Sequence, residues 1–343
     1  MRGPMNRKVF ISGPVRPMLG EAELRAAGCE IVLGKNVDDF PGYRYGTEEF
    51  IQLIDDADVL MVAQRDAVGR GVMSGLRELQ AIVKPTIGVE KIDVKAATEL
   101  GILVCNSPAP ENFIGLAEAT VGLVVDLFKK LKLNEAHLRA GGWKEPEKSG
   151  ALMMGRTVGI IGLGRVGRNV ARRLGAWEMN LMAYDPYVGE EVAAPLGVKM
   201  VPLEELLRQS DVVTLHVVLT VETRYMIGLK ELKMMKPTAY LVNTSRGPVI
   251  KEEDLIHAIN GRIIAGAALD VFAEEPLPMG SRLREVDATR LILTPHIIGN
   301  NPESRVTGHR MAVASTLAVL KGRVPDNLLN PEAVDRWRAR FWR

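Results

Sequence analysis

One glycine-rich segment, residues 157–167 with the sequence TVGIIGLGRVG, constrains the fold of this chain more than any other. The apolar run before the glycines suits a buried parallel strand, and the residues after them continue with helical periodicity. At G-x-G-x-x-G spacing, the first glycine allows the turn, the second lets the backbone approach a pyrophosphate, and the third lets helix and strand pack closely. The motif alone is weak evidence, but its surroundings also fit a dinucleotide-binding unit. The glycines are Gly162, Gly164 and Gly167.

Asp185 indicates which dinucleotide binds. It lies roughly 20 residues past the first glycine, at the end of the strand-like run 181–184. A carboxylate there can accept from both ribose hydroxyls of NAD and would repel the 2′-phosphate of NADP. The next residues, Pro186 and Tyr187, bring no arginine or lysine that would bind that phosphate. The sequence therefore predicts NAD as the cofactor.

Length and composition limit the classes of protein to which the chain can belong. With 343 residues it is long enough for about two domains. Its hydrophobic content of 47% and charged content of 25% are ordinary for a globular protein, and a net charge of +2 provides no basic field for nucleic acid. No apolar run reaches the roughly 18 residues of a membrane span. We therefore expect neither a nucleic acid nor a membrane among its partners.

The cysteines and the N-terminus indicate the compartment. Cys29 and Cys105 cannot form a disulfide framework and their spacing fits no metal-binding motif, so we expect buried thiols, no metal and a reducing environment. Residues 1–4 lead directly into the strand-like run 8–12 rather than into a signal peptide. These features predict a cytoplasmic protein.

Strand-like and helix-like segments alternate on both sides of the glycine turn, which predicts an α/β fold with parallel sheets and crossover helices. Breaks at residues 107–110 and 299–302 suggest that the last helix returns to the first domain. We therefore expect two doubly wound, Rossmann-like domains with a cleft between them. A substrate-binding, flavodoxin-like domain would comprise residues 1–106 and 301–343, and an NAD-binding Rossmann domain residues 107–300. Outside the glycine motif, the predicted strands are 9–12, 30–33, 59–62, 81–83, 102–106, 181–184, 212–216, 240–243, 265–269 and 291–293, and the predicted helices are 21–27, 47–54, 94–100, 203–209, 252–259 and 305–320.

Two further segments concern assembly. Residues 112–133 predict one long helix with too many apolar positions for a single face, so it is either buried in the monomer or packed against a second subunit. We favour the second alternative and expect a homodimer. The basic and aromatic segment 336–343 could lie on a membrane surface, but it is short for that role, and a solvated or subunit-docking tail fits it better.

Three polar residues follow strands in the second half of the chain, and they are candidates for catalysis. They are Arg246, Glu275 and His296. Because the carboxyl ends of strands in an open parallel sheet face the ligand crevice, all three could converge beside the nicotinamide. Each alone has a structural explanation: a surface ion pair, a turn cap or a hydrogen-bonded strand-end histidine. On successive strands of one nucleotide-binding domain they form a credible acid–base site.

Four motifs stand in this chain: GLGRVG at 162–167, NTSRG at 243–247, ALDVFAEEP at 268–276 and TPH at 294–296. With them, the chain resembles the NAD-dependent D-isomer specific 2-hydroxyacid dehydrogenase family over nearly its full length. The resemblance implies hydride transfer between NAD(H) and a small 2-oxo or D-2-hydroxy acid, mainly as a reductase in the cell. Arg246, Glu275 and His296 match the family's catalytic residues in order and spacing.

The resemblance assigns a role to each catalytic candidate, and the chemistry of the side chains supports the roles. His296 would protonate the developing alkoxide during reduction and accept the hydroxyl proton in the reverse direction. Glu275 would hydrogen-bond the other ring nitrogen and favour the charged imidazole. Arg246 would hold the substrate carboxylate and polarise the carbonyl.

Further contacts are implied by the resemblance alone. Asp270 would accept from the nicotinamide carboxamide, although it could equally be a structural turn acid. The loop amides of Ile87 and Gly88 would bind the substrate carboxylate. The full cofactor set is Gly162, Gly164, Arg165, Val166, Gly167, Asp185, Thr244, Asp270 and Gly299, and the full substrate set is Lys84, Ile87, Gly88, Asn112 and Arg246.

The chain departs from the family pattern at several positions around the substrate. Pro85 and Thr86 should stiffen a loop that is usually richer in glycine, and Lys84 is either a contact for a second acidic group or an exposed strand-end charge. Val218 replaces a usual proline, and Ile298, close to His296, replaces a small residue. These departures leave the substrate open among 3-phosphoglycerate, glyoxylate or hydroxypyruvate, and D-lactate types.

Two related classes compete with the dehydrogenase. Formate dehydrogenases pair their histidine with glutamine, whereas this chain has Glu275, so we do not expect that activity. Transcriptional corepressor relatives keep the fold and the catalytic residues but serve as NAD(H)-binding sensors with little turnover. We expect neither their disordered tail nor an additional regulatory domain in this chain.

Overall fold

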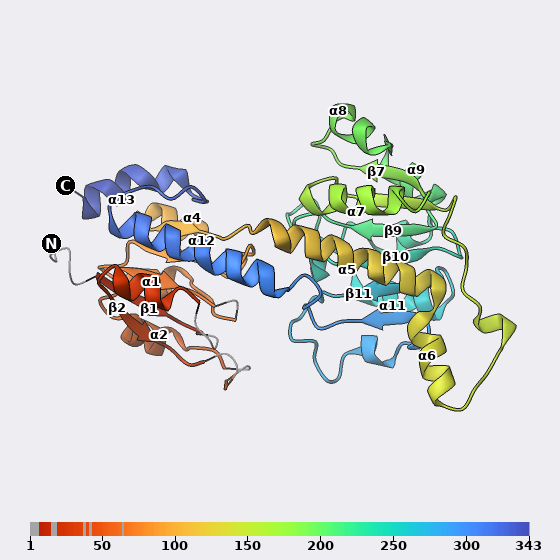
Figure 1. Ribbon diagram of the computed structural model, residues 1–343, viewed down its shortest axis with the longest axis horizontal. Helices are drawn as coiled ribbons and strands as arrows, with labels where there is room; N and C mark the ends of the chain where they lie inside the picture. Colours follow the sequence, from red (N-terminus) through yellow and green to blue (C-terminus); the bar gives the residue numbers. More distant parts are fainter. Residues whose placement is uncertain (1–6, 15–18, 37–38, 41–42, 64, 343) are drawn as a thin grey trace. The chain divides into compact units, whose positions relative to one another are not determined.

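The computed structural model describes residues 7–14, 19–36, 39–40, 43–63 and 65–342, which fall into two compact units (Figure 1). Unit 1 comprises Met1–Glu111 and Asn301–Arg343, and unit 2 comprises Asn112–Asn300. Each unit contains a parallel sheet with helices on both faces. The predicted fold class of two doubly wound, Rossmann-like α/β domains is confirmed.

Unit 1 contains a five-stranded parallel sheet in the order β2-β1-β3-β4-β5. The order reverses between β1 and β3, where ligands bind in open sheets of this kind. The strands are apolar because both faces of the sheet are covered. They are β1 (Arg7–Ile11), β2 (Cys29–Leu33), β3 (Val59–Met61), β4 (Ala81–Val83) and β5 (Leu103–Cys105). The helices are α1 (Glu21–Ala26), α2 (Thr47–Ile54), α3 (Arg70–Ser74), α4 (Val94–Glu99), α12 (Pro302–Leu320), η5 (Pro331–Ala333) and α13 (Val334–Phe341).

Alternation along β1 shows how two helical layers enclose this sheet. Val9 packs with Leu24 of α1 and Val313 of α12 in one apolar cluster. Phe10 points to the opposite face, where it packs with Phe50 of α2. Successive strand residues face opposite sides of a sheet, so each layer receives every second side chain.

Unit 2 contains a seven-stranded parallel sheet in the order β12-β11-β10-β9-β6-β7-β8. The order changes direction at β6, the strand before the glycine turn, as in dinucleotide-binding folds. The strands are β6 (Thr157–Ile161), β7 (Asn180–Tyr184), β8 (Val198–Met200), β9 (Val212–Leu215), β10 (Tyr240–Asn243), β11 (Gly266–Leu269) and β12 (Leu291–Leu293), and the helices are α5 (Pro110–Lys129), α6 (Leu131–Arg139), η1 (Pro146–Lys148), α7 (Arg165–Gly175), α8 (Glu190–Ala193), η2 (Ala194–Leu196), α9 (Leu203–Gln209), α10 (Leu229–Leu232), η3 (Gly247–Val249), α11 (Glu252–Asn260) and η4 (Arg282–Glu285).

Two helical layers also cover this sheet. Val124 of α5 and Val170 of α7 pack on one face, together with Val158 of β6. Leu206 of α9 and Leu255 of α11 belong to the cluster on the other face. Both faces of the sheet are therefore covered by apolar side chains. Polar side chains that serve a ligand are expected at the carboxyl ends of the strands instead.

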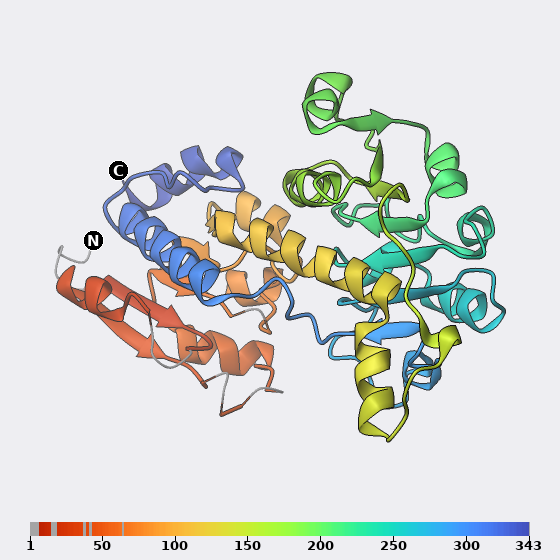
Figure 2. The same cartoon turned by 45° about the vertical axis from the view of Figure 1, so that its right-hand side comes forward.

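The expected single helix over 112–133 is wrong in one respect. Lys130 adopts a left-handed backbone, with φ of +53°, which ends α5 and starts α6 in a new direction (Figures 1 and 2). One face of α5, including Leu123 and Val124, is buried within unit 2. No residue of α6 is buried. The hydrophobicity of α5 is therefore explained in large part by its own unit.

The expectation of a solvated C-terminal tail is also wrong, while docking of this segment on a second subunit stays a prediction. Most of that segment forms α13, which packs on unit 1, and the Trp337 side chain is fully buried there. The Trp342 ring lies 6.1 Å from the Trp337 ring, and Arg7 stacks on Trp342. Arg340 donates to the backbone carbonyl oxygen of Leu100, near the end of α4. The basic and aromatic composition thus serves packing and helix capping.

Several short elements escaped the sequence analysis. They are α3, β8, α8, α10 and α13. Helices of four to eight residues show too few turns for a recognisable apolar period. Within the described ranges, no helix has the length and apolar content needed to cross a membrane.

Candidate active site

The glycine turn joins β6 to α7, and two of its glycines are required by close packing. Gly162 has φ of +94°, and a Cβ there would lie 2.8 Å from the backbone carbonyl of His216. A Cβ on Gly167 would lie 2.1 Å from the carbonyl oxygen of Gly162. No described atom lies within 4 Å of the corresponding position at Gly164. The turn is therefore tight on its inner side and open at Gly164, where a pyrophosphate would approach.

The start of α7 provides the donors for such a group. The backbone amides of Arg165, Val166 and Gly167 belong to its first turn, where no carbonyl of the helix can accept from them. The positive end of the helix dipole lies at the same place. Both features fit a bound anion.

Asp185 follows β7 and faces the glycine turn. Its Oδ2 accepts from the backbone amide of Leu163 at 2.8 Å, and its Oδ1 accepts from the amide of Tyr187 at 2.9 Å. A carboxylate oxygen can accept more than one hydrogen bond, so both oxygens retain capacity for ribose hydroxyls. The structure thus ties the acidic residue directly to the turn.

His296 and Glu275 form a hydrogen-bonded pair in unit 2. The Nδ1 atom of His296 lies 2.8 Å from Oε2 of Glu275, and Oε1 of Glu275 accepts from the amide of Phe272 at 3.1 Å. The hydrogen bond to Glu275 raises the pKa of His296, helped by the charges of Glu275 and Asp270 and opposed by burial and Arg246. Burial favours the neutral acid of Glu275, but hydrogen bonds and the charges of His296 and Arg246 outweigh it, so its pKa is lowered. The pair therefore favours imidazolium and carboxylate.

Arg246 follows β10, and its backbone packs directly on the segment that carries Glu275. Its Nη1 donates to the carbonyl oxygen of Ser245 at 2.7 Å. A Cβ on the next residue, Gly247, would lie 1.9 Å from the carbonyl carbon of Phe272. Only glycine fits so close to another backbone, so the spacing between the arginine loop and the glutamate loop is fixed. The charge of Arg246 also acts on the pKa of both His296 and Glu275.

Asp270 holds the turn that presents the histidine. Its Oδ1 accepts from Thr294 Oγ1 at 2.7 Å and from the Ile297 amide at 3.1 Å. His296 has φ of +51°, a left-handed conformation that is unfavourable for a residue with a side chain. Asp270 therefore stabilises a strained turn as a structural acid, and its contact with the carboxamide stays a prediction. Ile298 packs against the apolar cluster of α5 and α7.

Two hydrogen bonds join the remaining cofactor candidates to α5. Thr244 Oγ1 lies 3.0 Å from Thr120 Oγ1, and both side chains are buried. Asn112 donates through Nδ2 to the carbonyl oxygen of Gly299 at 3.2 Å. Asn112 is thus brought to the loop after His296, within unit 2.

The other substrate candidates lie in unit 1, in the loop after β4. Lys84 is only 2% exposed, so the reading of it as an exposed strand-end charge is wrong. Burial lowers its pKa to about 8. Within the described ranges, the backbone amides of Ile87 and Gly88 donate to no acceptor, while the carbonyl oxygen of Ile87 accepts from Asn106 at 2.9 Å. Two adjacent unpaired amides are suited to an anion.

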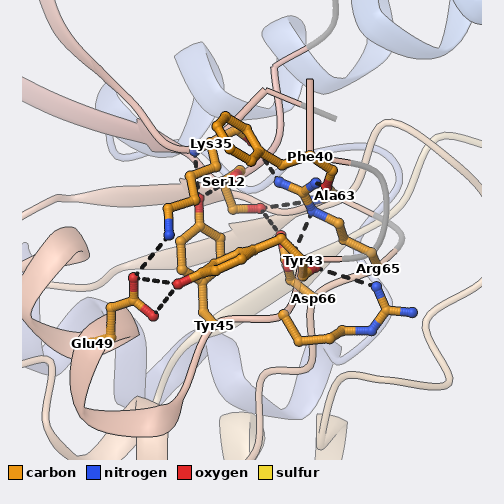
Figure 3. A network of polar contacts seen from close by, with 10 residues as sticks. Ser12, Lys35, Phe40, Tyr43, Tyr45, Glu49, Ala63, Arg65 and Asp66 are labelled. Carbon is orange, nitrogen blue, oxygen red and sulfur yellow. Dashed lines mark hydrogen bonds and ion pairs between the residues drawn. The ribbon is translucent and has the colours of Figure 1, made fainter. Parts of the chain in front are cut away.

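A polar network near the ends of β1, β2 and β3 was not anticipated (Figure 3). Asp66 Oδ2 accepts from Ser12 Oγ at 2.7 Å, and Tyr45 Oη donates to the Ser12 carbonyl oxygen at 2.9 Å. Arg65 donates to the carbonyl oxygens of Lys35 and Phe40. The network ties the loop after β2 to the loop after β3. No spacing in the sequence signals it, because its members come from separate loops.

The comparisons with known proteins decide the family. The profile described as "D-isomer specific 2-hydroxyacid dehydrogenase, NAD binding domain" matches residues 121–297. The chain is 35% identical to the glyoxylate reductase of Thermofilum pendens over 311 residues, which cover 89% of this chain and 90% of that protein. The chain belongs to the D-isomer specific 2-hydroxyacid dehydrogenase family.

Other members of the family show the range of relatives. The D-3-phosphoglycerate dehydrogenase of Methanocaldococcus jannaschii is 39% identical over 284 residues, 82% of this chain but only 53% of that protein, so the chain spans about half the length of that relative. The crystal structure of D-lactate dehydrogenase from Aquifex aeolicus, complexed with NAD and lactic acid, has a TM-score of 0.80 and 27% identity, covering 94% of this chain and 99% of that chain. The predictions of an NAD-dependent oxidoreductase and of NAD as cofactor are confirmed.

The sequence analysis missed two residues that support the candidate site. Glu252, at the start of α11, accepts from the amide of Ala273 at 2.5 Å and so anchors the loop before Glu275. Burial raises the pKa of Glu252. Thr120 supports Thr244 from α5. Neither residue stands in a motif that signals its contact. Within the described ranges, no group of histidine, cysteine or acidic residues is arranged to hold a metal ion.

Proposed function

We propose that the protein is an NAD-dependent D-2-hydroxyacid dehydrogenase in which Arg246, Glu275 and His296 are the catalytic residues. The observation that carries the proposal is the hydrogen-bonded pair of His296 and Glu275, at 2.8 Å, in the same unit as the glycine turn and Asp185. A histidine oriented by a carboxylate is suited to proton transfer near neutral pH. Unit 2 would be the NAD-binding domain and unit 1 the substrate-binding domain.

The residues of the glycine turn fit a dinucleotide. Open space at Gly164 and the amides of the first turn of α7 would receive the pyrophosphate, and Asp185 would receive the ribose. Arg165 and Val166 would flank the pyrophosphate. Thr244, Asp270 and Gly299 would lie toward the nicotinamide. When bound, NADH supplies the hydride that reduces the carbonyl carbon of a 2-oxo acid.

His296 would donate a proton to the carbonyl oxygen during reduction. Glu275 holds Nδ1, so Nε2 is the nitrogen left for the substrate. The raised pKa of His296 favours the protonated imidazole, which is the form that donates in reduction. In oxidation the neutral ring would accept the hydroxyl proton at the same nitrogen.

Arg246 would bind the substrate carboxylate and polarise the carbonyl, because a guanidinium offers a permanently charged fork of donors. The two unpaired amides of Ile87 and Gly88 in unit 1 are also suited to bind a carboxylate. Asn112, which donates to the Gly299 carbonyl oxygen, would contribute a polar contact to the substrate. The negative charge of the substrate carboxylate would thus be stabilised by preorganised protein donors rather than by water.

The proposed substrate of the protein belongs to one of three types. Glyoxylate or hydroxypyruvate, 3-phosphoglycerate and D-lactate remain candidates, in agreement with the names of the relatives. Lys84 would face a second acidic group if the substrate has one. The corepressor-like sensor is not favoured, because the named relatives are enzymes.

The test is NADH consumption by the purified protein against a panel of 2-oxo acids. The panel contains glyoxylate, hydroxypyruvate, pyruvate, phenylpyruvate, oxaloacetate and 3-phosphohydroxypyruvate. We expect turnover with at least one of them, and a Lys84→Met variant should lose turnover selectively for substrates with a second acidic group. Tight NADH binding with no turnover across the panel would instead support a sensor.

We also propose that the protein is a homodimer. The support lies in α6 and the segment after it, where no residue of the helix is buried and Trp143 is 74% exposed. Clusters of exposed apolar side chains mark association surfaces. The exposed large apolar residues of this region are Leu131, Leu138, Trp143, Leu152 and Met154.

Light scattering after gel filtration tests the dimer. We expect the wild type to elute as a dimer and a Leu138→Glu, Trp143→Glu variant to elute as a monomer, because buried unpaired charges oppose association. Met279→Glu is the matched control, since Met279 is 86% exposed elsewhere in unit 2. A monomeric wild type would refute the proposal.

A further inference from the structure

Arg165, the first residue of α7, stacks on the ring of Phe113 in α5. The guanidinium carbon lies 4.8 Å from the centroid of the ring. Both residues belong to unit 2, and the ring is half-buried near the start of α5. A cation at this distance over an aromatic face is attracted by the ring quadrupole.

This contact leaves the donors of Arg165 available. Among the described residues, no carboxylate oxygen lies within 4 Å of its guanidinium nitrogens, and its side chain donates to no described acceptor. Two other arginines of α7 have polar partners: Arg173 pairs with Glu118 at 2.8 Å, and Arg168 donates to the Gly164 carbonyl oxygen at 3.1 Å. A carboxylate would occupy the donors of Arg165 and neutralise its charge, whereas a ring against the flat face does neither.

We propose that Phe113 is a positioning residue for NAD, which holds the Arg165 guanidinium beside the amides of the glycine turn. The proposal rests on the proposed function, because it takes the glycine turn as the site of the dinucleotide. An arginine side chain loses much rotamer freedom when it binds an anion. With the ring in place, part of that ordering is complete before NAD arrives, and affinity for the pyrophosphate increases.

The experiment measures equilibrium binding of NADH, ADP and adenosine to the full-length protein by titration calorimetry. The variants are Phe113→Leu, Arg165→Leu and the double variant. Phe113→Leu should weaken the binding of NADH and of ADP about two- to fivefold, which corresponds to the free energy of an exposed cation–π contact. The affinity for adenosine should not change. In the Arg165→Leu background the same change should have no further effect, since the ring then has no cation to hold.

Two controls separate positioning from folding. Phe113→Tyr keeps an aromatic face and should restore wild-type affinity for NADH. Ile114→Ala alters the next residue of α5, which is 40% exposed, and should leave binding unchanged. The melting temperatures of all variants should agree within the small range of surface substitutions.

The outcomes distinguish this proposal from the proposed function. Wild-type affinity for NADH in Phe113→Leu would overturn the positioning role. So would an equal loss of NADH affinity on Phe113→Leu substitution in the wild type and in the Arg165→Leu variant. Unchanged NADH affinity in Arg165→Leu would overturn it as well. Failure of the wild type to bind NADH would instead contradict the proposed function.

Discussion

Glu275 accepts from His296 Nδ1 at 2.8 Å through one carboxylate oxygen and from the Phe272 amide at 3.1 Å through the other. The carboxylate is therefore fixed to the backbone on one side and orients the imidazole on the other. This arrangement leaves Nε2 for the proposed substrate contact and favours the charged form of the ring, because the pKa of His296 is raised. The pH dependence of the reaction should follow from it.

Replacing Glu275 with Gln should shift the pH profile. The pKa of His296 is raised above its ordinary value of about 6.5, so reductive kcat/KM should stay high below that raised pKa and decline as pH rises through it. Glu275→Gln removes the charge that raises this pKa, so the decline should move to lower pH. Initial rates of NADH oxidation between pH 5 and 9 check this, and an unmoved profile would rule out the coupling.

Oxidation of the 2-hydroxy acid should show the opposite slope. The reverse reaction needs neutral His296, so its kcat/KM should rise as pH increases through the same pKa. Measuring both directions in the same buffers therefore provides an internal control. Parallel slopes in the two directions would argue against proton transfer at His296.

Replacing Arg246 with Lys should reduce 2-oxo acid reduction by about 100-fold, because an ammonium cannot reproduce the two-pronged contact with a carboxylate and a carbonyl. NADH binding should change little, since the substitution keeps the charge. Steady-state kinetics and a parallel NADH titration measure the two effects. Near-normal turnover would discard the substrate role of this arginine.

Asp185 should determine the preference for NAD. Asp185→Ala should weaken the binding of NADH about 10- to 100-fold, because hydrogen bonds to a charged acceptor are lost. It should also reduce the preference for NADH over NADPH. Asp185→Asn is the matched variant, because it removes the charge and retains an acceptor for the Leu163 amide. If both variants kept the wild-type ratio of the two affinities, specificity would come from elsewhere.

Gly167 should tolerate no side chain. A Cβ there would lie 2.1 Å from the Gly162 carbonyl oxygen, so Gly167→Ala must move backbone in the turn. We expect a loss of about 1–3 kcal/mol in the free energy of unfolding, together with weak NADH binding. A Cβ on Gly164 would meet open space, so Gly164→Ala should cost little stability. Denaturant titration of the two variants measures this difference in the free energy of unfolding.

Much of the fold was predictable because strongly apolar strands alternate with helices, and the motifs marked the glycine turn and the three catalytic candidates. Periodicity cannot detect a single backbone rotation, so the break at Lys130 was missed. It also cannot show which face a short helix buries. Trp337 therefore appeared as part of a tail, although it lies in the core of unit 1.

Contacts between distant segments were the part of the site that the sequence could not supply. Glu252 reaches Ala273 and Thr120 reaches Thr244 only after the strands have paired and the helices have packed. Lys84 illustrates the same limit, because its position after β4 left an exposed charge as one of two interpretations, whereas its side chain is buried. Side-chain burial depends on tertiary neighbours that no local pattern encodes.

The most direct test of the central claim compares the wild type with His296→Ala, using a 2-oxo acid that supports turnover and a parallel titration with NADH. Loss of the proton donor should reduce turnover by about 10²- to 10⁴-fold while the affinity for NADH stays within about twofold of the wild type. Unchanged turnover in His296→Ala would contradict the assignment of His296 as the acid–base residue.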